Sequence, residues 1–392
     1  NERRKQFLHI EKFDIVLTTY PLILRDQVFH LAQHYHYVIL DESQHIKNAR
    51  SKTTQSIFNL SANFRLCLTG TPMENHLGEI WSMFHFLMPG YLGNIEKFNR
   101  LFKKPIEMHG DFDRQKQLSQ RLKPFMLRRT KSEVANELPP KTEIIRSIPI
   151  SGKQRDLYET IRIAMDKKVQ LEINKKGLAR SQIMILDALL KLRQICCDPS
   201  LLPDKFTQGI EVNSAKMELL MDLLPEMIIE GRKVIIFSQF VKMLNIIEKA
   251  ILKEGITYTK LTGQTKKRDE AINSFQQGEV DVFLISLKAG GVGLNLTAAD
   301  TVIHYDPWWN PAVENQATDR AHRLGQDKPV FVYKLLTTET VEEKILDLQK
   351  KKQKLADRLY DSKSKPTSEQ SHDSDNQMFS QHELLELLQP LD

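Results

Sequence analysis

The sequence predicts an α/β fold with two lobes, each built on a parallel sheet that is flanked by helices. Short apolar runs alternate with stretches whose apolar residues have helical spacing, first before residue 90 and again after residue 214. Alternation of strand and helix is typical of parallel sheets. Several of the runs end abruptly in polar residues or glycines, and in open α/β sheets ligands bind at that end of the strands.

The composition restricts the class of protein. A length of 392 residues predicts two or three domains. No apolar run approaches the roughly 18 residues that a membrane span needs. The net charge of +6 permits a polyanionic partner without requiring one. Cys67 lies in a predicted strand, and Cys196 and Cys197 are adjacent with no second pair to complete a zinc site. We therefore expect free thiols in a reducing compartment.

The first lobe is predicted to alternate strand and helix from its start. In chain order we expect a strand at 15–17, a helix at 22–31, a strand at 37–40, a helix capped by Ser51 that runs to 60, and a strand at 66–68. Asp41 and Glu42 follow the second strand directly, and Thr69 and Gly70 follow the third. Taken alone, two adjacent acids are most simply explained as solvated residues of a loop. With a strand before them and a second polar strand end after them, a ligand site is favoured.

The chain from residue 77 to residue 213 is predicted to be mainly helical. Helices are expected at 77–88, 154–175 and 182–195, and the alternating run 142–150 is predicted to be a crossing strand or a linker. The basic run 128–131 is either a solvated face or a contact with DNA or the other lobe. Ser151-Gly152-Lys153-Gln154 follows a strand, as a phosphate loop does. Ser147 replaces the upstream glycine and Gln154 replaces the magnesium-binding hydroxyl, so we expect a helix cap instead.

A second alternation begins at Ser214, which is predicted to cap a helix that runs to Glu230. Strands are then expected at 234–237, 258–261, 282–285, 301–305 and 330–336. A Lys-rich helix is expected at 341–360, a disordered stretch at 361–381, and a short amphipathic helix at 383–391 that either docks on its own lobe or binds a partner. These features predict four parts: a partial first lobe at 1–90, helical insertions and a linker at 91–213, the second lobe at 214–345, and the C-terminal helices and linker at 346–392.

The second lobe contains the most specific stretches. A strand ends in the glycine-rich turn of residues 284–296, and QATDRAHRLGQ at 316–326 follows DPWWNP at 306–311. Because Arg320 and Arg323 are three residues apart, we expect them on one face of a helix. Together with TTY, DESQ, LTGTP and VIIFSQF earlier in the chain, in the same order, these stretches resemble the Swi/Snf family of superfamily-two DNA translocases over residues 13–350. The Gln of DESQ is similar to bacterial members.

The resemblance implies two RecA-like lobes with helical insertions, the first lobe incomplete, and an ATP-driven motor that moves along double-stranded DNA. ATP and Mg²⁺ are then the expected cofactors. By motif position, Asp41 would hold the metal through its water shell and Glu42 would polarise the attacking water. Arg320 and Arg323 would stabilise charge in the transition state, with a structural ion pair as the alternative for either. The other nucleotide-binding candidates are Gln44, Thr69, Gly70, Thr71, Gly293 and Gln316.

The resemblance also implies contacts with DNA phosphates, which fix position without reading sequence. The candidates come from strand ends and glycine turns of both lobes: Thr19, Ser238, Gln239, Lys288, Gly290, Gly291 and Trp309. For Trp309 and its neighbour Trp308, packing is the simpler alternative.

One part of the family pattern is missing, because no glycine-rich G-K-T/S phosphate loop precedes Ile15. We therefore expect an N-terminally incomplete first lobe and a chain that hydrolyses no ATP by itself at a meaningful rate. The leading hypothesis is the greater part of a bacterial motor that is cytoplasmic, nucleoid-associated and monomeric, without a membrane partner. The alternatives are a catalytically inactive nucleic-acid-binding scaffold and a regulator that binds RNA polymerase. Only the amphipathic helix at the C-terminal end hints at the regulator.

Overall fold

The computed structural model describes residue 7 and residues 9–70, 77–129, 131–135, 137–207, 212–290, 293–360 and 385–389. The chain divides into two compact units, Asn1–Phe125 with Leu359–Met378 and Met126–Arg358 with Phe379–Asp392. Within the described ranges, no helix combines the length and the apolar character that a membrane crossing needs.

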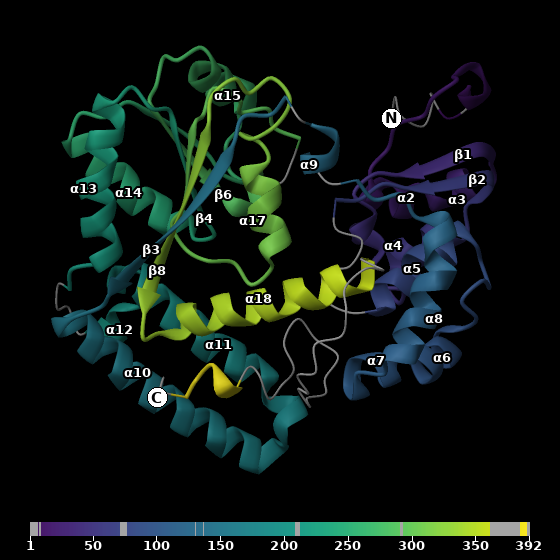
Figure 1. The fold of residues 1–392 in the computed structure, drawn as a ribbon, viewed down its shortest axis with the longest axis horizontal. Coiled ribbons are helices and arrows are strands. Elements are labelled where there is room, and N and C mark those ends of the chain that lie inside the picture. The colour runs from purple at the N-terminus through teal and green to yellow at the C-terminus, as the bar shows by residue number, and fades with distance from the viewer. Residues whose placement is uncertain are drawn as a thin grey trace. The chain divides into compact units, whose positions relative to one another are not determined.

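In its described residues, the first unit contains a two-stranded parallel sheet and a set of short helices (Figure 1). β1 (His34–Leu40) pairs in parallel with β2 (Ser61–Cys67). Its buried core includes Leu40 of β1, Ile57 and Phe86. The helices are η1 (Ile10–Lys12), α2 (Tyr20–Arg25), α3 (Gln27–Leu31), η2 (Ser43–Ile46), α4 (Lys52–Phe58), α5 (Leu77–Leu87), α6 (Ile95–Phe98), η3 (Asn99–Lys103), α7 (Lys104–His109), α8 (Phe112–Leu122) and η4 (Lys123–Phe125).

The prediction of a strand at residues 15–17 is wrong. Residues 15–17 have no regular secondary structure, and Leu17 is 93% exposed. A strand needs a neighbour for its backbone hydrogen bonds, and among the described residues of this sheet β1 and β2 pair with each other and not with this segment. The apolar run therefore lies at the surface. The helix expected at 22–31 is also divided, because α2 ends at Arg25 and α3 begins at Gln27.

The second unit is organised around a sheet that has six strands in the described residues. Its order is β3-β8-β7-β4-β6-β5, and every neighbouring pair is parallel. The five strands predicted for this lobe are confirmed as β4 (Val234–Ser238), β5 (Tyr258–Leu261), β6 (Val282–Ser286), β7 (Thr301–His304) and β8 (Val330–Thr338). β3 (Lys141–Pro149) pairs with β8 along its whole length. The segment predicted to be a crossing strand or a linker is thus a strand at the edge of this sheet.

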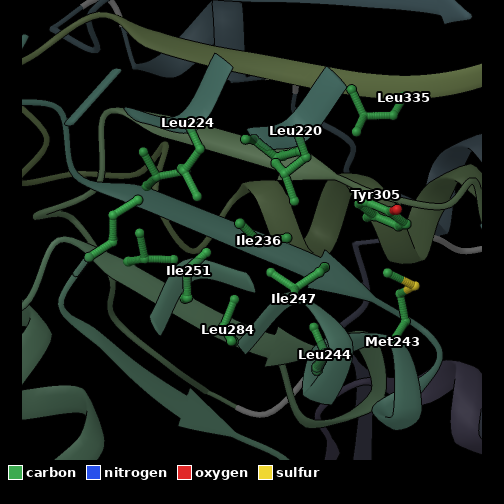
Figure 2. Packing of buried hydrophobic residues seen from close by; sticks show 14 of the residues in the cluster. Leu220, Leu224, Ile236, Met243, Leu244, Ile247, Ile251, Leu284, Tyr305 and Leu335 are labelled. Carbon is green, nitrogen blue, oxygen red and sulfur yellow. The ribbon is translucent and has the colours of Figure 1, made fainter. Parts of the chain in front are cut away.

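Successive residues of β4 alternate between two apolar cores. Val234 and Ile236 belong to one core, together with residues of α13 (Ala215–Ile229) and α14 (Val241–Lys253), as Figure 2 shows. Ile235 and Phe237 belong to the other, together with residues of α15 (Arg268–Gln276) and α17 (Pro311–Thr318). Strand side chains point alternately to opposite faces, so helices cover both faces of this sheet. The predicted class, parallel sheets flanked by helices, is confirmed.

The remaining helices of the second unit include a long packed pair, α10 (Gly152–Lys176) and α11 (Leu178–Cys197). The others are α9 (Lys131–Val134), η5 (Pro199–Leu201), α12 (Asp204–Thr207), α16 (Leu287–Gly290) and α18 (Val341–Tyr360). Of the predicted helix caps, Ser214 accepts from Met217 N at 3.3 Å and Ser51 accepts from Thr54 N at 3.1 Å. Ser151 occupies the N-cap position of α10, but its side chain makes no cap bond.

The amphipathic helix predicted at the end of the chain is described over residues 385–389. Leu387 and Leu388 are buried. Arg162 of α10 donates to Leu388 O at 3.3 Å, and Lys344 of α18 donates to Glu386 O at 2.9 Å. Of the two alternatives, this segment therefore docks on its own unit. The disordered stretch predicted at 361–381 lies outside the described residues.

Candidate nucleotide and nucleic-acid sites

The two acidic residues at the end of β1 form a tight turn. Glu42 N donates to Asp41 Oδ1 at 2.9 Å, and the Tyr20 hydroxyl donates to Asp41 O at 2.6 Å. Glu42 has a φ of 50°, in the left-handed region that residues with a side chain rarely adopt. Burial raises the pKa of Tyr20 above its usual value, so the hydroxyl remains a proton donor at neutral pH. These hydrogen bonds hold the acidic turn in its uncommon conformation.

A hydrogen-bond chain joins the acidic turn to the end of β2. Gln44 Nε2 donates to Glu42 Oε2 at 2.8 Å, and Thr69 Oγ1 donates to Gln44 Oε1 at 2.9 Å. The backbone also links the two strand ends, because Ser43 N donates to Leu68 O at 2.9 Å. The structure thus brings together polar groups that the sequence places on different strands, at the end of a parallel sheet where ligands bind.

The acidic turn has the chemistry that a magnesium ion needs. Asp41 is exposed, and carboxylate oxygens are hard ligands of the kind that Mg²⁺ prefers. Magnesium keeps several waters and is commonly held by one or two carboxylates together with substrate phosphates. A cluster of three or more protein ligands is therefore not required, and the described residues contain none. Gly70 is exposed directly after Thr69, and Thr71 lies outside the described residues.

The prediction that Arg320 and Arg323 share a helix face is wrong. α17 ends at Thr318, and both arginines lie in the turns that follow it. Regular α-helical hydrogen bonding is interrupted here, because Arg320 N donates to Ala317 O, three residues back, at 3.2 Å, and a four-residue bond that follows runs from His322 N to Thr318 O at 3.1 Å. Of the motif's polar candidates, Gln316 does lie on α17, and it is half-buried.

Arg320 and Arg323 are connected through the segment after Gly293, which follows β6 and α16, and not through a shared helix face. Arg320 O accepts from Leu296 N at 2.9 Å, and Arg323 Nη1 donates to Leu294 O at 3.4 Å. Gly293 has a φ of 46°, which a glycine adopts without steric cost. Arg323 is exposed and Arg320 is half-buried. The structure therefore places these three nucleotide candidates around one connected pair of turns in the second unit.

Asp306 organises two of the predicted nucleic-acid residues. Ser238 Oγ donates to Asp306 Oδ1 at 2.5 Å, and Gln239 N donates to Asp306 Oδ2 at 3.2 Å. Ser238 is buried and also accepts from Phe240 N at 3.1 Å, so its hydroxyl is directed into the unit and Gln239 lies nearer the surface. Burial raises the pKa of Asp306, while the charge of Arg193 and the bond from Ser238 act in the opposite direction.

The other nucleic-acid candidates differ in what their surroundings allow. Thr19 is exposed at the N-cap of α2 in the first unit, and Lys288 is exposed on α16 in the second. Gly290 is buried, and a Cβ at this position would lie 2.7 Å from Phe237 Cε1, so packing alone requires a glycine here. Gly291 lies outside the described residues.

Trp309 packs against a buried arginine that sequence reasoning missed. Arg193 of α11 is 2% exposed, and its Cζ lies 4.8 Å from the ring centre of Trp309 and 5.7 Å from that of Trp308. These are cation-π distances. Arg193 Nη2 also donates to Pro307 O at 2.5 Å. The packing alternative therefore describes both tryptophans in this structure.

Sequence signals existed for two of the three residues that were missed. Arg193 interrupts an apolar helix face that includes Leu189 and Leu192, both fully buried, and a charge in such a place needs a partner. Asp306 follows a buried strand directly, in the same pattern that singled out Asp41. For the bond from Tyr20 to the acidic turn, the sequence offers no signal, because the two segments are joined only by the fold.

The profiles of two protein families match the sequence. The SNF2-related domain matches residues 1–201, and the helicase conserved C-terminal domain matches residues 215–325. Together the two matches cover most of the chain.

Several curated proteins and solved structures are similar to the chain. The Bacillus subtilis protein "Putative ATP-dependent helicase/translocase YwqA" is 41% identical over 363 residues, which are 91% of this chain and 39% of that protein. The human SWI/SNF-related matrix-associated actin-dependent regulator of chromatin subfamily A member 1 is 37% identical over 347 residues, 86% of this chain and 33% of the relative. The chain thus spans about two fifths or less of these relatives' length.

Among solved structures, the Sulfolobus solfataricus SWI2/SNF2 ATPase core in complex with dsDNA is 37% identical, with a TM-score of 0.47 over 89% of this chain and 73% of that chain. The SNF2-related profile alone covers the first 201 of 392 residues. The match to this profile agrees with the family that the DESQ, LTGTP and QATDRAHRLGQ stretches resemble. The chain belongs to the SNF2-related family, with a helicase C-terminal domain as its second part.

Proposed function

We propose that this chain supplies the catalytic carboxylates and the DNA-binding surface of an ATP-dependent translocase on double-stranded DNA. The observation that carries the proposal is the hydrogen-bond chain Glu42–Gln44–Thr69 at the adjoining ends of β1 and β2. A structural acid pair needs no such chain. A group that must orient a water molecule does, because catalysis of phosphoryl transfer is mainly positioning and charge stabilisation.

In this proposal each polar residue of the first unit has a separate task. Asp41 would hold a magnesium ion through water, and the ion would supply positive charge to neutralise the phosphates of ATP. Glu42 accepts a hydrogen bond from the attacking water and orients it. Gln44 fixes the Glu42 carboxylate by a hydrogen bond. Its second hydrogen bond couples the position of this carboxylate to Thr69, which follows β2 in the LTGTP stretch.

Arg320 and Arg323 of the second unit are the proposed donors to the negative charge that develops during phosphoryl transfer. The turns that carry them are tied to the glycine-containing exit of β6 through Leu294 and Leu296. Exposure of Arg323 leaves its guanidinium group accessible for this role. Hydrolysis would then depend on both units.

The DNA-binding residues are proposed to contact phosphates and not base edges. Thr19, Gln239 and Lys288 lie at a helix N-cap, a strand end and an exposed short helix. Contacts of these kinds fix a duplex without reading its sequence. Ser238 acts indirectly in this proposal, because its buried hydroxyl holds the turn that presents Gln239.

The test is release of phosphate from ATP by the full-length protein, with and without duplex DNA. We expect stimulation by duplexes of unrelated sequence and displacement of a third strand from triplex DNA, which reports movement along a duplex. Glu42→Gln should lower turnover by about 10²- to 10⁴-fold, the usual contribution of a group that orients or activates a reacting water. ATP turnover that is the same with and without DNA, or that is unchanged in Glu42→Gln, would refute the proposal.

A second candidate is a DNA-binding scaffold without catalysis. The sequence contains no G-K-T/S stretch, the loop that holds triphosphates in related motors. Residues 1–392 alone are therefore expected to bind DNA but to hydrolyse ATP slowly. If the full-length protein is equally slow while it binds DNA normally, the scaffold is the correct function.

A further inference from the structure

Two buried cations hold the backbone between Tyr305 and Trp309. Lys216 of α13 donates to Tyr305 O at 2.9 Å, and Arg193 of α11 donates to Pro307 O at 2.5 Å. Both cations come from helices outside the motifs that the sequence singled out. Asp306 lies in the chain between these two residues, Tyr305 and Pro307. The backbone is therefore held by a hydrogen bond on each side of Asp306.

Burying the charged side chain of Arg193 costs free energy, and the few hydrogen bonds that it makes compensate for only part of this cost. Its Nη2 donates a hydrogen bond to Pro307 O and its guanidinium group stacks on Trp309, while its Nε has no hydrogen-bond partner among the described residues. The charges of Arg193 and the buried Asp306 act on each other, and replacing such a buried pair as a whole by apolar side chains of similar volume is often neutral or stabilising. Stability alone is therefore a weak reason for an arginine at this place, and a positioning role is the better explanation.

A continuous set of contacts leads from Arg193 to the strand end. Arg193 fixes Pro307, the neighbouring Asp306 accepts from Ser238 and from Gln239 N, and Ser238 accepts from the next turn of the backbone. Each step is a hydrogen bond of 3.2 Å or less or a covalent link. If the loop moved, the turn at Ser238 and Gln239 would lose both of its bonds to Asp306.

We propose that Arg193 is a positioning residue for DNA binding. By fixing the loop 306–309, it sets the turn at Ser238 and Gln239 in the conformation that meets the phosphates. A displacement of the α10–α11 pair would then reach the DNA surface through Arg193, in addition to the hydrogen bond from the Tyr305 hydroxyl to Cys197 O of α11. The inference rests on the proposed function, since it assumes that the turn contacts DNA.

The test compares Arg193→Lys with Arg180→Lys, the same change at an exposed position of the same helix. Lysine keeps the charge, but it cannot donate to Pro307 O and stack its head group flat on Trp309 at once. Binding of the 392-residue chain to a short labelled duplex is measured by fluorescence anisotropy. We expect Arg193→Lys to weaken binding about tenfold, a typical coupling between residues of one network, and Arg180→Lys to bind as the unsubstituted chain does.

A double-mutant cycle with Ser238→Ala separates positioning from a general loss of stability. If Arg193 acts through the Ser238 turn, the double variant binds no more weakly than the weaker single variant. Additive losses, or normal binding by Arg193→Lys, would overturn the inference and leave the proposed function intact. Failure of the unsubstituted chain to bind duplex DNA would overturn both. Should Arg193→Lys not fold, Arg193→Gln, whose amide group can still donate to Pro307 O, replaces it with the same expectations.

Discussion

Replacing Lys216 by methionine should destabilise the second unit strongly. Lys216 and Glu342 form an ion pair at 2.7 Å in which both side chains are 0% exposed. Lys216 Nζ also donates to Tyr305 O and Leu335 O, each at 2.9 Å, so one ammonium group joins α13, α18 and the ends of β7 and β8. Burial is the largest single effect and lowers the pKa of Lys216, but the charge and hydrogen bond of Glu342 together with the neighbouring Cys197 and Cys196 raise the pKa above its usual value.

The structure limits the size of the effect. Removing one partner of a buried ion pair costs about 3–5 kcal/mol, because the other charge remains buried without compensation. Glu342 would keep its bonds from Thr337 N at 2.9 Å and Thr337 Oγ1 at 2.8 Å, so we expect the lower end, about 3 kcal/mol. For a folding unit of this size that corresponds to a fall in melting temperature of roughly 6–12 °C.

Thermal unfolding followed by circular dichroism measures the change, with Lys253→Met at an exposed position of α14 as a surface control. The double variant Lys216→Met/Glu342→Gln removes both charges while an amide oxygen still accepts from Thr337 N, so it should recover a substantial part of the loss. The stabilising effect of the pair should be complete below the usual lysine pKa and disappear as the pH rises through the folded-state pKa. A melting temperature for Lys216→Met within about 1 °C of the unsubstituted chain would show that the pair contributes no net stability.

Three further outcomes are expected. Arg320→Ala and Arg323→Ala in the full-length protein should each lower ATP turnover by roughly 10³- to 10⁵-fold with nucleotide affinity nearly unchanged, and near-normal turnover in both would contradict their role. Duplex binding should weaken steeply from low to moderate salt and be similar for unrelated sequences in anisotropy titrations, whereas a strong preference for one sequence would contradict phosphate binding. Burial lowers the pKa of His304 to about 3. Unfolded chains therefore bind a proton there that the folded unit does not, and stability should fall as the pH drops from about 6.5 toward 3, less steeply in His304→Asn.

The second sheet could be predicted from the sequence because its signal is local. Two of its five predicted strands, 234–237 and 282–285, are uninterrupted apolar runs, and the other three are rich in aliphatic, aromatic and β-branched residues between turns, a local pattern that predicts a strand. β3 was more difficult, since its burial alternates only weakly along the strand. Its place at the edge of the sheet depends on pairing with β8, which begins almost two hundred residues later at Val330.

Two predictions that were wrong, the shared helix face of Arg320 and Arg323 and the strand at 15–17, failed because they also depended on contacts that a local pattern does not show. The spacing of Arg320 and Arg323 predicts a shared helix face only if the helix continues, but α17 ends at Thr318 and turns follow, in which three-residue and four-residue hydrogen bonds are mixed. Ile15–Leu17 has the composition of a strand, but strand formation also needs a neighbour with free backbone groups. In both cases the local pattern was not sufficient, because Ile15–Leu17 pairs with no strand among the described residues and the turns of the two arginines bond to Leu294 and Leu296, far away in the sequence.

The acidic turn shows the opposite case, in which motif position and geometry agree. Asp41 and Glu42 were predicted from one strand end and Thr69 from another, with no information on how the ends approach each other. Parallel pairing of β1 with β2 brings them together, and Gln44 closes the remaining distance with two hydrogen bonds. Since a carboxamide can donate and accept at once, Gln44 connects a carboxylate to a hydroxyl, which neither a methyl group nor a second acid could do. The side chain that the resemblance assigns to nucleotide sensing thus contacts both strand ends, and its replacement by leucine would separate the acidic turn from Thr69 without removing any charge.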